Sequence, residues 1–159
     1  MPPDDFKKYL NKEITNAIIK KTKLFLLYID IDNMKYFNAH NGYLAGDKLI
    51  ERFAILIKPL LKHNLFFRVR GEEFAIILPA MGHQEVLHLA KKICYLSRCQ
   101  LAGEQPLHCG DKHCMGVAKI SVSIGMESLK GNMDINKMRK NAEKKMYNAK
   151  RKGKDCICE

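Results

Sequence analysis

The chain has 159 residues, of which 47% are hydrophobic, and its formal net charge is +11. This length supports one domain with a substantial core and is too short for two, so we expect a single domain over residues 1–159. No apolar run approaches membrane-spanning length and the start lacks a signal-peptide pattern, so we expect a cytoplasmic chain without membrane contact.

The first predicted element is an N-terminal helix over about residues 1–22, capped by Asp4 or Asp5. Its apolar positions recur at helical spacing: Phe6, Tyr9, Leu10, Ile14, Ala17 and Ile18. The next run, LFLLYI from Leu24, is apolar without alternation, which predicts a central strand buried on both faces.

A polar, glycine-containing stretch from Asn33 to Gly46 predicts a helical turn and a loop. A helix is predicted from about Leu44 to His63, with Pro59 either kinking it or ending its regular part early. From Asn64 to Leu78, two apolar runs flank the turn Arg-Gly-Glu-Glu, which predicts a β-hairpin with acids at its tip.

The remaining elements are a helix over 82–100, a cysteine-bearing loop over 101–116, a strand over 118–125 and a helix over 134–151. In the strand, Ile120, Val122 and Ile124 alternate with Lys119, Ser121 and Ser123, so we expect one wet face. Gly153 ends the last helix, and Lys154 to Cys158 can add a short edge strand. The order predicts an α+β fold, with helices packed on a mixed sheet.

The six cysteines are expected to be reduced thiols, because the chain has no secretion signal. Cys109 and Cys114, with His108 and His113 beside them, offer half of a zinc site. Their spacing is not the usual short knuckle and no matching pair is evident, so a structural zinc site is disfavoured.

The basic excess is concentrated in the last predicted helix and the residues after it: Lys137, Arg139, Lys140, Lys144, Lys145, Lys150, Arg151, Lys152 and Lys154. A helix this basic is usually a solvated face. The chain lacks a zinc-finger pattern, an aromatic stacking run and a recognition helix, so nucleic-acid binding is not expected. The same lysines suit a highly charged nucleotide.

Two pairs of acids are the main candidates for chemistry. Asp30 and Asp32 end the buried strand and point the same way, because side chains alternate along a strand. Buried carboxylates need a compensating positive charge, and oxygen ligands suit Mg²⁺ or Mn²⁺. If Glu72 or Glu73 of the hairpin faces Asp30, the acids form a hard-cation site of the kind that serves phosphoryl chemistry.

Five motifs in the same order and spacing resemble the GGDEF domains of diguanylate cyclases. They are DIDNMKYFN from Asp30, Gly42 with Gly46-Asp47, RVRGEEF from Arg68, SVSIG from Ser121, and Ala142-Glu with YNAK from Tyr147 and Gly153-Lys154. The signature at the hairpin is a variant, RGEEF. The resemblance covers nearly the whole chain from Leu24 onward.

This resemblance implies a palm-like sheet, related to the ferredoxin-like fold, that binds one GTP per subunit. Two subunits would meet in a transient homodimer, and each ribose 3′-hydroxyl would attack the α-phosphate of the other GTP, giving cyclic di-GMP and pyrophosphate. Two Mg²⁺ or Mn²⁺ ions per site would be held by Asp30, Glu72 and the backbone carbonyl of Ile31. Glu73 would be a further metal ligand or base, and Lys35 would assist catalysis.

The resemblance also assigns the substrate contacts. The amides of Asn33 and Met34 would cradle the β- and γ-phosphates, as the first amides of a helix can. Lys35, Lys150 and Lys154 would pair with the triphosphate, and Lys154 stands where the family usually has arginine. Asn38 and Asp47 would read the guanine edge, because guanine donates from its ring nitrogen and exocyclic amine.

The sequence departs from the family at two places. Arg70 replaces the first glycine of the signature, where it can crowd the nucleotide, need an unfavourable torsion, or contact a phosphate. A degenerate GTP-binding module without catalysis therefore stands as the alternative function. The family's product-binding Arg-x-x-Asp is Leu61 and Asn64 here, so feedback inhibition through that site is not expected.

Overall fold

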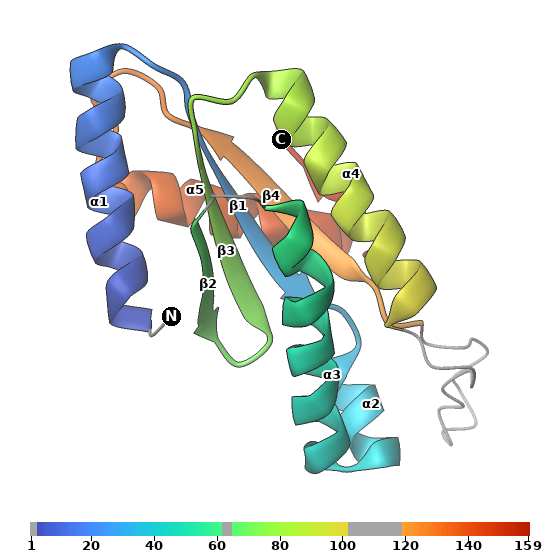
Figure 1. Cartoon of the computed structure of the whole chain (residues 1–159). Helices are drawn as coiled ribbons and strands as arrows, with labels where there is room; N and C mark the ends of the chain where they lie inside the picture. Colours follow the sequence, from blue (N-terminus) through green and yellow to red (C-terminus); the bar gives the residue numbers. More distant parts are fainter. Residues whose placement is uncertain (1–2, 62–64, 102–118) are drawn as a thin grey trace.

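The computed structural model describes residues 3–61, 65–101 and 119–159 (Figure 1). The helices are α1 (Pro3–Lys20), α2 (Met34–Asn41), α3 (Tyr43–Ile57), α4 (His83–Gln100) and α5 (Ile135–Arg151), with the short 3-10 helix η1 (Lys58–Leu60). The strands are β1 (Leu24–Ile31), β2 (Leu65–Arg70), β3 (Glu73–Pro79), β4 (Val122–Ser128) and β5 (Ile157–Cys158).

The strands form one mixed sheet in the order β2-β3-β1-β4-β5. Strand β1 runs antiparallel to both β3 and β4, and β5 pairs parallel with β4 at the edge. All eight residues of β1 are buried, which confirms the predicted central strand. The predicted hairpin and the short edge strand are also present.

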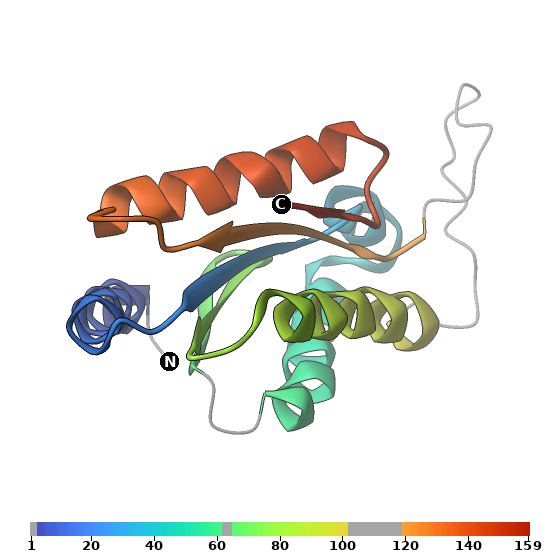
Figure 2. The same cartoon turned by 90° about the horizontal axis from the view of Figure 1, so that it is seen from above.

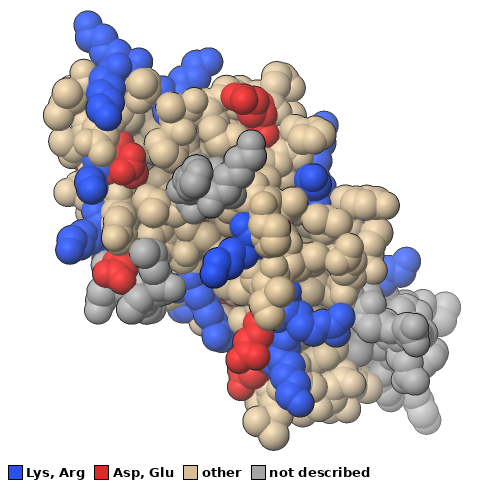
Figure 3. All heavy atoms as spheres, in the orientation of Figure 1, with Lys and Arg blue, Asp and Glu red and all other residues tan. Residues whose placement is uncertain are grey.

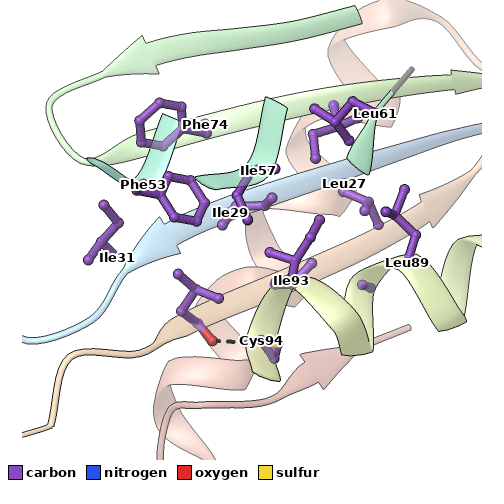
Figure 4. Packing of buried hydrophobic residues seen from close by; sticks show 14 of the residues in the cluster. Leu27, Ile29, Ile31, Phe53, Ile57, Leu61, Phe74, Leu89, Ile93 and Cys94 are labelled. Atoms are coloured by element: carbon purple, nitrogen blue, oxygen red, sulfur yellow. Dashed lines mark hydrogen bonds between the residues drawn. The ribbon is translucent and has the colours of Figure 1, made fainter. Parts of the chain in front are cut away.

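Helices cover both faces of the sheet (Figure 2). On one face, α3 and α4 pack on alternate residues of β1; Figure 4 shows Phe53 and Ile93 pointing toward Leu27 and Ile29. On the other face, α1 and α5 pack on a second cluster that includes Leu26 and Tyr28. The predicted α+β fold with helices on a mixed sheet is therefore correct.

Three predicted helix details need correction. The stretch from Asn33 to Gly46 is not a turn and loop, because it contains helix α2 and the start of α3. The helix predicted to His63 ends at Ile57 and continues as η1, so its bound is corrected while the expected early end of its regular part near Pro59 is confirmed. Ile18 is 45% exposed, because the inward stripe of α1 ends at the preceding residue, Ala17.

The predicted wet face of the fourth strand is wrong. Ser121 and Ser123 are buried, and the strand itself runs from Val122 to Ser128. Both hydroxyls donate hydrogen bonds to the carboxylate of Asp32, so their burial leaves no polar atom unsatisfied. The alternation of apolar and small polar residues here therefore belongs to a segment that is buried on both faces.

Some expectations concern residues outside the described ranges, among them the loop over 102–118 with Cys109 and Cys114, and Asn64. Four other cysteines are free thiols: Cys94, Cys99, Cys156 and Cys158. Within the described ranges, no helix is both long and apolar enough to cross a membrane. On the face drawn in Figure 3, lysines and arginines lie in separate places over the surface.

Candidate active site

The site is built where the hairpin meets the end of the central strand. Gly71 forms the turn with a φ of +45°, a backbone conformation that favours glycine. The register then places Glu73 directly opposite Asp30. The amide of Ile31 donates to the carbonyl oxygen of Glu72 at 3.2 Å, so both glutamates lie beside the end of β1.

Asp30 is a buried carboxylate, and Lys150 is its cationic partner among the described residues. Its Oδ1 lies 2.5 Å from Nζ of Lys150, which projects from α5, and the two atoms form an ion pair without hydrogen-bond geometry. Burial raises the pKa of Asp30 to about 6; the Lys150 ammonium opposes this rise, and the carboxylates of Glu72 and Glu73 add to it. The Lys150 ammonium therefore does not fully compensate the buried carboxylate of Asp30.

This shift predicts that Asp30→Asn stabilises the metal-free chain above about pH 6. The folded-state pKa of about 6 lies above the ordinary value of 3.8, so the stability contributed by the neutral carboxyl is complete below 3.8 and is lost as pH rises through 6. The variant should gain on the order of 2–3 kcal/mol at neutral pH. Urea unfolding in EDTA across this pH range measures it, and a difference that does not vary with pH would contradict the prediction.

The donor set fits a hard divalent cation. Asp30 at the end of β1 and Glu72 in the turn between β2 and β3 supply carboxylate oxygens, and among the described residues the cation paired with Asp30 is the Lys150 ammonium. Across the described ranges, no group of three His, Cys, Asp or Glu side chains is arranged to hold a metal ion. Mg²⁺ commonly binds through one or two carboxylates, with water and substrate phosphates completing its shell, so two protein carboxylates suffice.

Asp32, the second candidate acid at the end of the buried strand, has a structural role. Its carboxylate accepts from the hydroxyls of Ser121 at 2.7 Å and Ser123 at 2.8 Å, and from the amide of Asp155 at 3.2 Å. Asp32 is fully buried, and these neutral donors satisfy it. It thereby ties the end of β1 to β4 and to the turn after α5. Ser121 and Ser123 were the sequence signal for this role of Asp32, since residues two apart on a strand share a face.

The turn after α5 brings Lys154 to the start of α2. Lys154 and Asp155 both have positive φ, of 68° and 50°, and Arg98 pairs with Asp155 at 3.0 Å. Nζ of Lys154 donates to Oδ1 of Asn33 at 2.5 Å, and Nδ2 of Asn33 donates to the carbonyl of Lys119 at 2.7 Å. Asn33 and Lys154, both predicted phosphate contacts, are thus brought together.

The other predicted phosphate contacts are Met34, Lys35 and Lys150. Met34 is the first residue of α2, whose opening amides have no partner inside the helix. Lys35 is exposed on the same turn. Lys150, by contrast, is paired with Asp30 rather than exposed to solvent. The N-terminus of α2 therefore offers backbone amides together with the side chains of Lys35 and Lys154, and anions bind favourably at a helix N-terminus.

Asn38 and Asp47, the predicted guanine contacts, lie on the adjacent helices α2 and α3. The side chain of Asn38 packs on Gly46, where any Cβ would collide with its amide oxygen. That oxygen is buried and has no hydrogen-bond partner within the described ranges. Asp47 is exposed. A ligand donor can satisfy such an amide oxygen.

Arg70 is held on the α5 side of the hairpin. It lies in β2 and is absent from the residues with positive φ, so the expected torsional difficulty does not arise. Its guanidinium pairs with Glu73 at 2.8 Å and with Glu143 of α5 at 3.0 Å. Glu143 was assigned no role from the sequence, because its partner lies 73 positions away.

Comparison with known proteins gives a family match over most of the chain. The family model for the diguanylate cyclase GGDEF domain matches residues 4–156. Diguanylate cyclase DgcS of Shewanella oneidensis is 26% identical over 153 residues, covering 93% of this chain and 47% of the relative. A diguanylate cyclase of Vibrio cholerae is 31% identical, covering 85% of this chain and 39% of the relative. The chain thus spans less than half the length of these relatives.

Solved structures share the fold. The GGDEF domain of DgcB from Caulobacter crescentus, solved in complex with c-di-GMP, superposes with a TM-score of 0.85 at 24% identity, covering 99% of this chain and 86% of that one. The active GGEEF domain of a diguanylate cyclase from Vibrio cholerae gives a TM-score of 0.83 at 26% identity, covering 99% and 95%. The palm-like fold expected from the resemblance is therefore present.

Proposed function

Because the chain belongs to the diguanylate cyclase GGDEF domain family, we propose that it condenses two GTP into cyclic di-GMP and pyrophosphate. The observation that carries this proposal is the buried carboxylate of Asp30, whose pKa is raised and which lies beside Glu72 at the end of β1. In each half-reaction, a ribose 3′-oxygen forms a bond to the α-phosphorus of the other GTP. The bond to the pyrophosphate oxygen breaks, and the hydroxyl proton is released.

Asp30 and Glu72 are the proposed side-chain ligands for two Mg²⁺ or Mn²⁺ ions, with the carbonyl of Ile31. Bound there, the ions would neutralise charge on the leaving pyrophosphate and lower the pKa of the attacking hydroxyl. Lys150 neutralises part of the Asp30 charge, and its ammonium would also be within the group of cations proposed for the triphosphate.

The proposed triphosphate contacts are the amides of Asn33 and Met34 with Lys35, Lys150 and Lys154. Asp32 positions this group through the turn that carries Lys154. Lys35 would stabilise charge on the transferring phosphate. Since Lys154 supplies one ammonium rather than an arginine fork, we expect its contact to be weaker than a bidentate one.

Asn38 and Asp47 are proposed to select guanine. Asp47 can accept from the ring nitrogen and exocyclic amine of guanine, an arrangement that adenine does not offer. The unpartnered amide oxygen of Asn38 supports a ligand contact at this place. One subunit holds one GTP, so condensation needs two subunits with their sites facing, and we propose a transient homodimer.

Incubation of the purified chain with GTP, ATP or both, in Mg²⁺ or Mn²⁺, tests this function. The expected product, separated and identified by mass, is cyclic di-GMP from GTP and none from ATP alone. Asp47→Ala should raise the KM for GTP at least about tenfold, because a carboxylate that accepts from guanine is lost. Saturable GTP binding without any product would favour the non-catalytic regulatory module instead.

We also expect no feedback inhibition through the segment before the hairpin. Leu61 is 2% exposed and belongs to the core, so it offers no charged group to a phosphate. Cyclic di-GMP added at about 100 μM should leave the initial rate within about twofold. Tight product binding with loss of turnover, abolished by a change at residues 61–64, would contradict this expectation.

A further inference from the structure

Arg70 joins the hairpin to α5 through two carboxylates. Its Nε lies 2.8 Å from Oε2 of Glu73, and its Nη2 donates to Oε1 of Glu73 at 3.1 Å and to Glu143 at 3.0 Å. Arg139 approaches the other oxygen of Glu143 at 3.4 Å. The two arginines and two glutamates form a charge-balanced cluster across the two elements.

The Glu73 carboxylate is fully engaged within this cluster. Oε1 accepts from Arg70, and Oε2 accepts from Arg70 and from the hydroxyl of Tyr28 at 3.0 Å. Glu73 is 7% exposed, and a bidentate arginine contact is among the stronger hydrogen-bonded pairs. Glu73 therefore has little capacity left for a further ligand.

Glu72 is held differently. Its backbone is fixed to Ile31, while its side chain is half-buried and acts electrostatically on Asp30. Glu73 lies opposite Asp30 in the strand register. If Arg70 did not hold it, the Glu73 carboxylate could turn toward Asp30 and Glu72 and act as a third acidic ligand. The choice between two and three acidic ligands thus depends on what holds Glu73.

We propose that Arg70 is a positioning residue that, with Tyr28 and Glu143, withholds the Glu73 carboxylate from the metal ions. Metal binding by the side chains of this chain then rests on Asp30 and Glu72. The inference rests on the proposed function, since it concerns the ions of that same site. It assigns a role to the residue that departs from the family signature.

A double-mutant cycle on metal affinity tests the proposal. Mn²⁺ binding is measured by electron paramagnetic resonance in the presence of a GTP analogue with a methylene bridge between the α- and β-phosphates. Glu73→Gln should weaken binding less than threefold when Arg70 is present and at least tenfold in the Arg70→Gln background. A charge effect acting at a distance would be nearly equal in both backgrounds, so the inequality identifies direct ligation.

Two single variants and a positive control sharpen the result. Arg70→Gln alone frees a carboxylate near Asp30, and should strengthen Mn²⁺ binding at least threefold without any change at Glu73. Arg139→Gln is the matched control, because Arg139 contacts Glu143 but not Glu73, and it should change binding less than twofold. Glu72→Gln should weaken binding at least tenfold.

The outcomes distinguish a failure of this inference from a failure of the proposed function. Weakening of tenfold or more by Glu73→Gln with Arg70 present, or unchanged or weaker binding in Arg70→Gln, overturns this inference alone if the wild-type chain binds Mn²⁺ and analogue. A wild-type chain that binds neither Mn²⁺ nor the analogue overturns the proposed function, and this inference with it.

Discussion

Glu72→Gln is expected to reduce cyclic di-GMP formation by about a thousandfold or more. Metal ions in such a site supply several kcal/mol of stabilisation to the transition state, and the amide of glutamine is a poor substitute for a carboxylate ligand. The measurement is the initial rate of product formation at saturating GTP and Mn²⁺, followed by mass or by released pyrophosphate.

This loss should occur without unfolding. Glu72 is half-buried and raises the pKa of Asp30, so removing its charge relieves repulsion between the two carboxylates. Glu13→Gln serves as the control, because Glu13 lies on α1, where its side chain accepts from Asn16 at 3.3 Å, and it should leave the rate unchanged. A Glu72→Gln variant that keeps a tenth or more of the wild-type rate would remove Glu72 from the proposed ligand set.

Gly125→Ala is expected to cost about 3 kcal/mol of folding free energy. Gly125 lies in β4 where α5 crosses closely, and a Cβ there would collide with the carbonyl oxygen of Ala142 and the amide nitrogen of Met146. Both are backbone atoms of one helix, so relief requires α5 to move off the sheet. Urea unfolding at pH 7 gives the change in free energy.

The same substitution should also disturb the site, because α5 carries Lys150 and Glu143. Gly131→Asn is the matched control: Gly131 has a φ of +53° and open space around its Cα, and asparagine tolerates this conformation. Its stability should stay within about 1 kcal/mol of wild type. If Gly125→Ala were as stable as the control, the close packing of α5 on β4 would not be a constraint.

Much of the fold follows from local patterns in the sequence. The run from Leu24 is apolar at every position, which favours a strand covered on both faces, and Gly71 between two apolar runs favours a hairpin. Helical periodicity located α4 and α5 to within a residue or two. The five spaced motifs were sufficient to identify the family before any contact was known.

The tertiary structure alone decided the partners of the polar residues. Ser121 and Ser123 alternate with isoleucine and valine as surface residues do, and only the approach of Asp32 makes their burial favourable. Two adjacent glutamates in the hairpin look equivalent in sequence. The register placed Glu73 opposite Asp30, and Arg70 then engaged it together with Tyr28.

The physical reason is the range of the interactions. Burial of an apolar strand and the conformation of a turn depend on residues within a few positions, so the sequence by itself determined the elements, their order and the family. A carboxylate's partner depends on strand register and helix packing, which join residues as distant as Asp30 and Lys150 or Arg70 and Glu143. That Arg70 holds Glu73 and not Glu72, which we propose as the metal ligand, was therefore decided only in the folded chain.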